Sequence, residues 1–323
     1  MLNVSRPSAR VLRAVHAQTS TGRRRAAVRT FATRDIDEAR REEARTKTPH
    51  EAVSGSLREP TIRELYSLKG RTAIVTGGGR GLGVSIAGAY LEAGADVYCV
   101  DVLPTAASPE EWDRLSTLAK NSGLTLGYRQ LDITKQAQVN EVFRDIAAEA
   151  PSPVRVLMAS AGIQHESNAI DYDETDVRRV IDVNTVGTFN SVQAAARLMQ
   201  QHNLGGSIAM IASMSATIAN RGLTCVPYNA SKAALVQMAR SLAMEWAPAI
   251  RVNTLSPGYI KTILTERLVQ DNPHRLERWE GDNPLGRMSL PWEYKGPAVF
   301  LASDASSFVN GFDLRCDGGH AMW

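Results

Sequence analysis

Residues 76–83 read T-G-G-G-R-G-L-G, and the other features of the chain can be placed around them. They follow the apolar run 73–75 and precede residues 84–93, whose composition favours a helix. A strand, a glycine-rich turn and a helix in this order bring backbone N–H groups and the positive end of a helix dipole to one point, where a phosphate group binds. The stretch predicts a pyrophosphate cradle, although such turns also occur as plain structural corners. The candidate cofactor-binding residues in it are Gly77, Arg80, Gly81, Leu82 and Gly83.

The length and composition favour one large α/β domain. The chain has 323 residues, of which 43% are hydrophobic, and this is enough to bury a full core. No apolar run approaches the ~18–20 residues that a membrane span needs. The net charge is +3, but residues 1–34 hold eight arginines and no acid, so the rest of the chain is net negative. The charge therefore does not indicate a nucleic-acid partner.

The cysteines and histidines do not predict a metal site. Cys99, Cys225 and Cys316 form no close pair and stand in apolar surroundings, which is typical of small core residues. The six histidines show no ligand spacing.

The N-terminal residues have the composition of a targeting segment. Residues 1–34 are rich in Arg, Ser, Thr and Ala, as in mitochondrial transit peptides. Arg29 lies two residues before a candidate cut after Phe31. We expect residues 1–31 to be a transit peptide to the mitochondrial matrix, with a disordered basic arm as the alternative. Residues 32–60 are polar and predict a flexible linker, and the domain is expected at 61–323.

Apolar, β-rich runs alternate with helical patterns along the rest of the chain. This alternation predicts a Rossmann-type, doubly wound parallel sheet of about seven strands, with helices on both faces and no second domain. The expected strands are residues 73–75, 96–100, 124–131, 154–159, 208–212, 250–255 and 312–316. The expected helices are residues 82–93, 110–121, 136–150, 173–202, 226–247 and 291–303.

Two residues give opposite indications about the cofactor. Asp101 ends the second predicted strand, where an acid accepts hydrogen bonds from the adenosine ribose and repels a 2′-phosphate. Arg80 lies in the glycine-rich turn, where a basic side chain can meet a 2′-phosphate. Asp101 is given more weight, because the repulsion between a carboxylate and a phosphate dianion costs more free energy than the attraction of a flexible arginine contributes. The sequence therefore predicts NAD, with NADP as the second choice, while a simple turn-capping role for Asp101 stays open.

Tyr228-x-x-x-Lys232 is the candidate chemical centre. Residues four apart share one face of a helix, so the phenol and the ammonium can lie side by side. A nearby positive charge stabilises the phenolate and lowers the tyrosine pKa, as general acid–base catalysis at neutral pH requires. Upstream, an apolar strand ends in Ser213 and Ser215, either of which can hydrogen-bond a substrate oxygen. Asn184 falls within a long helix, where it is unfavourable unless it holds a water or kinks the helix.

These motifs occur together in the order found in short-chain dehydrogenases/reductases, which residues 66–323 resemble. The resemblance adds L-D-I-T at 131–134, A-G at 161–162 and S-P-G at 256–258. It implies that Asn184, Ser213, Tyr228 and Lys232 are catalytic. Tyr228 is then the acid/base, Ser213 orients the reacting oxygen, Lys232 holds the nicotinamide ribose and Asn184 anchors a relay water. The further cofactor-binding residues that it implies are Asp132 (at the adenine), Ile133, Ser160, Ala161, Gly162, Pro257, Gly258, Ile260 and Thr262.

Within the family the chain looks most similar to fungal polyol dehydrogenases. This implies hydride transfer between NAD and a secondary hydroxyl of a sugar alcohol, such as D-arabinitol to D-ribulose, in a homo-tetramer or homo-dimer. The alternatives are an NADP-dependent ketose or 3-oxoacyl-carrier reductase, and a non-catalytic binding subunit. Ser160 stands where the family has an asparagine that helps to hold the turn after the fourth strand. Trp279 and Asn283 fall where a substrate lid is expected and are candidates to face a polyol.

Overall fold

The computed structural model describes residues 58–322, so the predicted transit peptide and most of the predicted linker lie outside the described residues. Seven strands form one sheet in the order β3-β2-β1-β4-β5-β6-β7, and every neighbouring pair is parallel. The predicted doubly wound sheet is confirmed. The strands are β1 (Thr72–Thr76), β2 (Asp96–Asp101), β3 (Leu126–Gln130), β4 (Val154–Ala159), β5 (Gly206–Ile211), β6 (Ile250–Pro257) and β7 (Asp313–Cys316).

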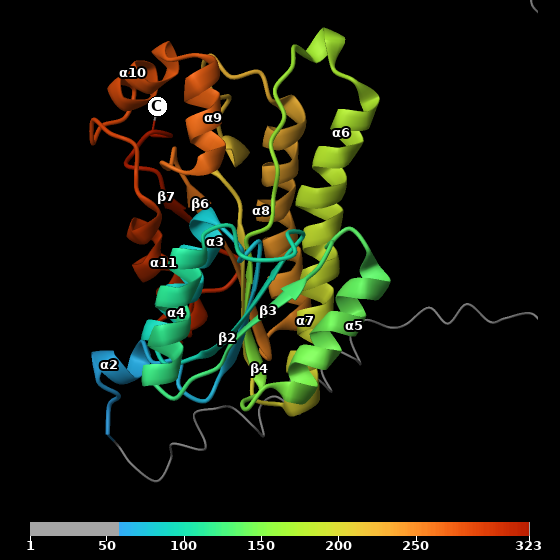
Figure 1. Cartoon of the computed structure of the whole chain (residues 1–323), viewed down its shortest axis with the longest axis vertical. Coiled ribbons are helices and arrows are strands. Elements are labelled where there is room, and N and C mark those ends of the chain that lie inside the picture. The colour runs from blue at the N-terminus through green and yellow to red at the C-terminus, as the bar shows by residue number, and fades with distance from the viewer. Residues whose placement is uncertain (1–57, 323) are drawn as a thin grey trace, which may run out of the picture. The chain divides into compact units, whose positions relative to one another are not determined.

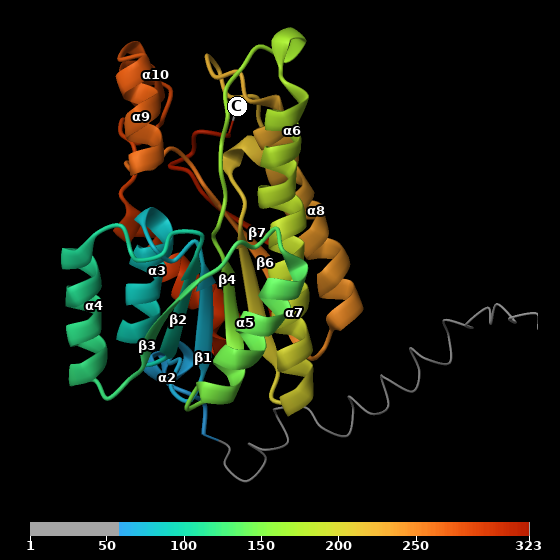
Figure 2. The same ribbon diagram turned by 45° about the vertical axis from the view of Figure 1, so that its right-hand side comes forward.

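Helices cover both faces of the sheet (Figures 1 and 2). One buried apolar cluster joins the sheet to α5 (Gln136–Glu149), α7 (Thr188–His202) and α8 (Val226–Trp246). A second cluster, on the opposite face, joins it to α3 (Gly81–Glu92), α4 (Pro109–Asn121) and α11 (Lys295–Ala302). Central strands buried on both sides explain why the strand segments are continuous apolar runs rather than alternating ones.

The ends of several elements follow local sequence signals. Ser108 accepts a hydrogen bond from the N–H of Glu111 at 3.2 Å, and Pro109 occupies the first turn, so α4 begins where its sequence predicts. Ahead of the sheet, Thr61 caps the short helix α2 (Ile62–Leu65) in a reciprocal contact with Glu64.

The prediction of one helix over residues 173–202 needs correction. The structure has α6 (Glu174–Ile181), the π-helical turn η3 (Asp182–Gly187) and then α7. Asn184 lies in η3. The helix therefore departs from regular α-helical geometry at Asn184, where a kink was one of the two expected alternatives. Three helices were not predicted, the short α2 and the helices α9 (Ile263–Asp271) and α10 (His274–Gly281), and residues 291–294 form a 3₁₀ turn ahead of α11.

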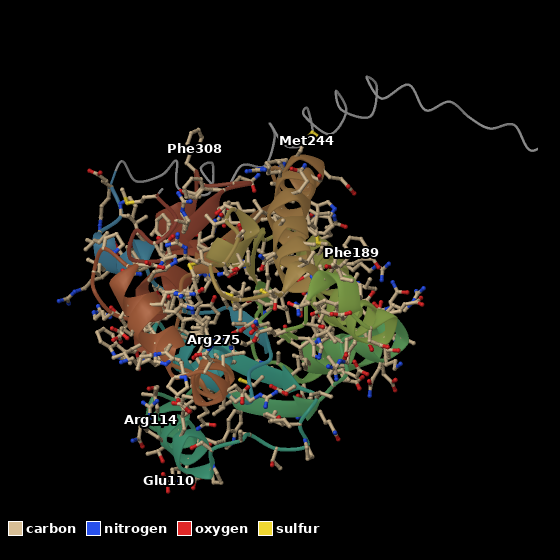
Figure 3. All side chains as sticks on the ribbon, turned by 90° about the horizontal axis from the view of Figure 1, so that it is seen from above. Glu110, Arg114, Phe189, Met244, Arg275 and Phe308 are labelled. Carbon is tan, nitrogen blue, oxygen red and sulfur yellow. The ribbon has the colours of Figure 1, made fainter. Side chains whose placement is uncertain are left out.

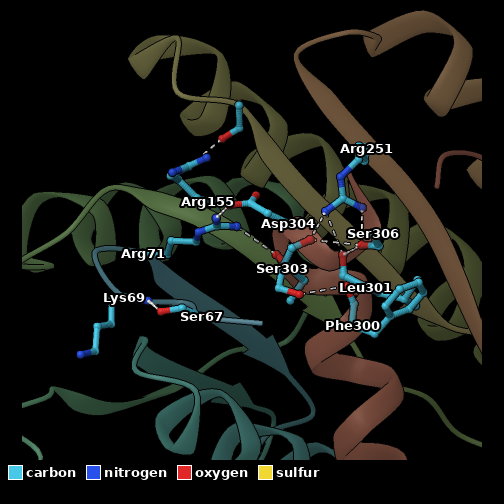
Figure 4. A network of polar contacts seen from close by, with 12 residues as sticks. Ser67, Lys69, Arg71, Arg155, Arg251, Phe300, Leu301, Ser303, Asp304 and Ser306 are labelled. Carbon is cyan, nitrogen blue, oxygen red and sulfur yellow. Dashed lines mark hydrogen bonds and ion pairs between the residues drawn. The ribbon is translucent and has the colours of Figure 1, made fainter. Parts of the chain in front are cut away.

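An arginine network closes the amino edge of the sheet (Figure 4). Arg251 donates to the carbonyls of Leu301 at 3.1 Å and Ser303 at 2.9 Å, at the C-terminal end of α11. Arg71 pairs with Asp304 at 2.5 Å. Cationic side chains suit this end of a helix because its unpaired carbonyls carry partial negative charge. The network fixes α11 against the sheet and leaves the carboxyl edge open for ligands.

The opposite edge carries the loops that follow the strands, together with α9 and α10 (Figure 2). Among residues 58–322, no helix is both long and apolar enough to cross a membrane. In the same range, no group of three His, Cys, Asp or Glu side chains is arranged to hold a metal ion.

Candidate active site

A cavity of about 1330 Å³ lies along the carboxyl edge of the sheet. The strand order reverses between β1 and β4, and ligands of open parallel sheets bind at such a switch point. Most of the predicted site residues come together here because they lie just after strands, and parallel strands end at one edge. Those lining the cavity are Gly77, Arg80, Gly81, Leu82, Gly83, Asp101, Asp132, Ile133, Ser160, Ala161, Gly162, Ser213, Tyr228, Lys232, Pro257, Gly258, Ile260 and Thr262.

The glycine-rich turn leaves no room for side chains where it meets its neighbours. Gly77 has φ +65°, and a Cβ there would lie 2.8 Å from the backbone of Ala161. A Cβ on Gly83 would lie 2.1 Å from the carbonyl oxygen of Gly77. The first turn of α3 contains no acid, and its N-cap residue Arg80 makes no side-chain capping bond. The N–H groups at the start of α3 are therefore available to an anion, and this end of the helix fits a dinucleotide pyrophosphate.

Thr76 holds the turn after β4. Its hydroxyl accepts hydrogen bonds from the N–H groups of Ser160 and Ala161, both at 3.2 Å. Its carbonyl accepts a second bond from Ser160 N at 3.2 Å. A side chain of β1 thus secures the turn in which Ser160 replaces the family's asparagine.

Asp101 is buried at the end of β2, with its carboxylate fixed by the backbone. Oδ2 accepts from the N–H of Gly79 at 3.0 Å, and Oδ1 accepts from the N–H of Leu103 at 3.2 Å. The turn-capping role is therefore real, but it does not remove the carboxylate from the cavity, which Asp101 lines. Arg80, by contrast, is exposed on the turn. Asp132 also lines the cavity, and its Oδ1 accepts from the N–H of Thr134 at 2.9 Å and from the Thr134 hydroxyl at 2.8 Å.

Ser213, Tyr228 and Lys232 meet at the centre of the cavity. The Lys232 ammonium nitrogen lies 5.7 Å from the centroid of the Tyr228 ring and donates to the carbonyl of Ile211 at 2.7 Å. Tyr228 keeps some accessible surface on the cavity, but burial of its hydroxyl raises its pKa to about 12, while a hydrogen bond with Ser213 lowers that pKa. Burial also lowers the pKa of Lys232 to about 8.

The predicted source of tyrosine activation is not the one seen in this structure. Lys232 was expected to lower the pKa of Tyr228, but the group that lowers it here is the Ser213 hydroxyl. The reason is that Lys232 is directed to the Ile211 carbonyl and is itself desolvated, which disfavours its charged form.

The contact with Tyr228 also separates the two candidate serines. Ser213 interacts with Tyr228, whereas Ser215, which also lines the cavity, contacts Ser213, with its N–H and hydroxyl each 3.1 Å from Ser213 Oγ. The geometry therefore favours Ser213 as the residue that works with the tyrosine, and Ser215 as its support.

We expect Ser213→Ala to reduce kcat/KM for alcohol oxidation by about 10²-fold at neutral pH, as loss of one positioned donor does. The hydrogen bond stabilises the phenolate, so its removal raises the Tyr228 pKa and moves the rising limb of the pH–rate profile to higher pH. The measurement is kcat/KM against pH for both serine variants. Ser215→Ala should show the smaller loss, and the reverse order would assign the contact to Ser215.

Asn184 is fully buried and does not line the cavity. Its Oδ1 accepts from the N–H of Ile163 at 2.8 Å, and its Nδ2 donates to the carbonyl of Ile163 at 2.8 Å and to the hydroxyl of Ser231 at 3.0 Å. The side chain is thus hydrogen-bonded to protein groups, and the expectation that Asn184 anchors a relay water stays a prediction. It ties the π-helical turn to the loop after β4 and to α8.

The lid residues proposed from sequence position do not line this cavity. Trp279 is only 2% exposed and stacks on Tyr259, with ring centroids 4.0 Å apart. Asn283 donates to the carbonyl of Asp317 at 2.8 Å and accepts from the N–H of Leu285 at 2.9 Å. Sequence position alone could not show that Trp279 supports Tyr259 from behind instead of facing the substrate.

Sequence reasoning did not single out several polar residues that line the cavity, among them Gln164, Asn220 and Tyr259. Gln164 Nε2 and Asn220 Oδ1 are buried without a hydrogen-bond partner, while Asn220 Nδ2 donates to the Tyr259 hydroxyl at 3.2 Å. Their positions after β4, β5 and β6 are a weak signal that could have identified them, because residues after parallel strands gather at one edge.

This fold and this site are those of an oxidoreductase that uses a nicotinamide dinucleotide. A family model described as Enoyl-(Acyl carrier protein) reductase matches residues 77–321. A protein of Aspergillus versicolor named "Short chain dehydrogenases/reductase notP'" is 41% identical over 268 residues, covering 81% of this chain and 91% of the relative. The chain belongs to the short-chain dehydrogenase/reductase family.

Two further relatives carry more specific names. A "D-arabinitol 2-dehydrogenase [ribulose-forming]" of Scheffersomyces stipitis is 38% identical over 268 residues, covering 80% of this chain and 96% of the relative. The crystal structure of a gluconate 5-dehydrogenase from Burkholderia cenocepacia, in complex with NADP and tartrate, is 31% identical with a TM-score of 0.73. It covers 81% of this chain and 100% of the solved one.

Proposed function

We propose that the protein oxidises a secondary hydroxyl of a sugar alcohol to a ketone with NAD, as in the conversion of D-arabinitol to D-ribulose. The observation that carries the proposal is the Ser213–Tyr228 pair beside Lys232 in a cavity with a glycine-rich phosphate cradle. The substrate class is supported by the polar groups of Gln164, Asn220 and Tyr259 in the same cavity. It is also supported by the likeness to the ribulose-forming dehydrogenase of Scheffersomyces stipitis.

The chemistry follows from the roles that these side chains can play. A bound nicotinamide ring supplies the acceptor for the hydride that leaves the carbinol carbon. Tyr228, as the phenolate, takes the proton of the reacting hydroxyl, so that the carbinol loses one hydride and one proton and becomes a ketone. Ser213 hydrogen-bonds the reacting oxygen and stabilises the phenolate. Lys232, whose ammonium nitrogen lies 5.7 Å from the centroid of the Tyr228 ring, is proposed to hold the nicotinamide ribose.

The test is the initial rate of oxidation of D-arabinitol, galactitol and D-mannitol with NAD or NADP, beside reduction of D-ribulose and of a 3-oxoacyl thioester. Turnover of a polyol with NAD is the expected result. Turnover of the thioester with NADPH, and of no polyol, would establish the 3-oxoacyl reductase function instead.

NAD is the proposed cofactor because Asp101 cannot easily turn away from a 2′-phosphate. Two backbone N–H groups hold its carboxylate at the cavity. We expect Asp101→Ser to lower the ratio of kcat/KM with NAD to kcat/KM with NADP by about tenfold or more, since charge repulsion between groups a few ångströms apart is worth ~1–4 kcal/mol. The matched control is Asp113→Ser on α4, which lies outside the cavity and should leave the ratio unchanged. An unchanged ratio in Asp101→Ser would show that another group sets the preference.

We propose a mitochondrial location, supported by the arginine-rich, acid-free composition of residues 1–34. Sequencing the N-terminus of the mature protein after import into isolated mitochondria tests it, and a start at Ala32 is the expected result. An uncleaved, unimported chain would contradict it.

We also propose a homo-tetramer or homo-dimer, from the family resemblance. Native mass spectrometry or light scattering of the purified protein decides between these states and a monomer.

A further inference from the structure

A buried amide at the edge of the cavity has no partner in the protein. Gln164 lines the cavity, and its Nε2 atom is buried without a hydrogen bond. The Cys225 thiol is a weak acceptor close enough that Gln164 lowers the Cys225 pKa, but the contact falls short of hydrogen-bond geometry at the Gln164 nitrogen. An unsatisfied buried donor costs about 1–3 kcal/mol of folding free energy. A ligand that accepts a hydrogen bond from this nitrogen would offset that cost.

The backbone around Gln164 is fixed on both sides, which fixes the point from which its side chain extends. Ile163, immediately before it, gives both its N–H and its carbonyl to Asn184, each at 2.8 Å. Ser167, three residues after it, donates its N–H to the carbonyl of Thr224 at 3.0 Å. The segment is therefore clamped between the π-helical turn and the chain that leads into α8.

These anchors place Gln164 close to the reacting centre. A Cβ built on Gly162 would lie 3.4 Å from the Lys232 nitrogen, so the chain entering Gln164 runs directly past that lysine. Cys225, the neighbour of Gln164, is the N-cap residue of α8, and Tyr228 lies in the first turn of that helix. Gln164 does not contact Tyr228 or Ser213 through any hydrogen bond, which leaves it outside the proton-transfer step.

The same cavity also contains a buried hydrogen-bond acceptor without a partner. Asn220 Oδ1, an acceptor, is also buried without a partner. A hydroxyl group is both a donor and an acceptor, so a ligand with several hydroxyls satisfies both amides, whereas a ligand with a single reacting hydroxyl leaves them unpaired.

We propose that Gln164 binds a hydroxyl of the substrate other than the one that reacts, and so makes the enzyme selective for polyhydric alcohols. This inference rests on the proposed function. Gln164 is a specificity residue and takes no part in hydride or proton transfer. Sites built to hydrogen-bond a substrate hydroxyl discriminate strongly against analogues that lack it, because the buried polar groups are then left unpaired.

The experiment compares Gln164→Met, which keeps the length of the side chain and removes its hydrogen-bonding amide, with the wild-type enzyme on D-arabinitol and pentan-2-ol. We expect Gln164→Met to lower kcat/KM for D-arabinitol by about 10- to 100-fold, mainly through KM, and to leave pentan-2-ol within about twofold or improve it. The matched control is Gln201→Met, at an exposed position of α7, which should change neither substrate.

A binding measurement gives a readout that does not depend on turnover. In the Tyr228→Phe background with NAD present, calorimetric titration with D-arabinitol should show a Kd raised by about the same factor when Gln164→Met is added. Equal losses on both alcohols, or no loss on D-arabinitol, would overturn the inference while leaving the proposed function intact. If the wild-type enzyme turned over pentan-2-ol and no polyol, both the inference about Gln164 and the proposed function would be overturned. The rates of the wild-type enzyme alone would show this.

Discussion

Tyr228→Phe is expected to abolish nearly all turnover while the protein still binds its dinucleotide. The substitution removes one oxygen and keeps the ring, so the packing around α8 should persist. The lost oxygen is the group that hydrogen-bonds Ser213 and would exchange the proton with the substrate. General acid–base catalysis contributes roughly 10²–10⁴-fold to a rate, and no other described tyrosine hydrogen-bonds Ser213, so kcat should fall by about 10³-fold or more.

The measurement is kcat for D-arabinitol together with the Kd for NAD from protein fluorescence. The Kd should stay within about threefold of the wild-type value. Tyr66→Phe is the matched control, because Tyr66 precedes the sheet and does not line the cavity, and its kcat should be unchanged. Substantial activity in Tyr228→Phe would mean that a different group moves the proton and would end the proposed mechanism.

Gly83→Ala is expected to have the largest effect on cofactor binding. The added methyl group would lie 2.1 Å from the carbonyl oxygen of Gly77, which belongs to the backbone of the cradle and cannot swing aside as a side chain could. Relief requires the turn to open, which displaces the N–H groups that would hold the pyrophosphate. We expect the Kd for NAD to rise by about 100-fold or more, and the free energy of unfolding to fall by about 1–3 kcal/mol, as overpacking does.

Gly296→Ala is the matched control. Gly296 also lies in the first turn of a helix, α11, but nothing lies within 4 Å of a Cβ built there. Alanine favours the helix over glycine, so this variant should gain about 0.5–1 kcal/mol in the free energy of unfolding and bind NAD as before. Urea denaturation and NAD titration of the two variants give both numbers. Equal NAD affinities of Gly83→Ala and Gly296→Ala would show that the close contact between Gly83 and Gly77 is not needed to bind the cofactor.

The strands, most of the helices and the glycine-rich turn could be predicted because local patterns specify them. Continuous apolar runs identified the strands, and Ser108 with Pro109 marked the start of α4. Many of the candidate cofactor residues were implied by the family resemblance, and the structure gathers them because most lie just after parallel strands, which end at one edge. The helices α9 and α10 were not predicted, because the contacts that hold them are distant in sequence. One of these is the ion pair between Arg275 (labelled on α10 in Figure 3) and Glu166, at 2.5 Å.

The sequence by itself determined the fold class, the order of the elements and the residues that gather at the carboxyl edge. Only the tertiary structure decided what each residue does there. It showed that Ser213, rather than Ser215, interacts with Tyr228 and lowers the Tyr228 pKa. It also showed that the Asn184 side chain hydrogen-bonds the loop after β4. It also buried Trp279 behind Tyr259 and left Gln164 without a partner. Each of these depends on distance and burial between segments far apart in the chain, which periodicity and spacing do not contain.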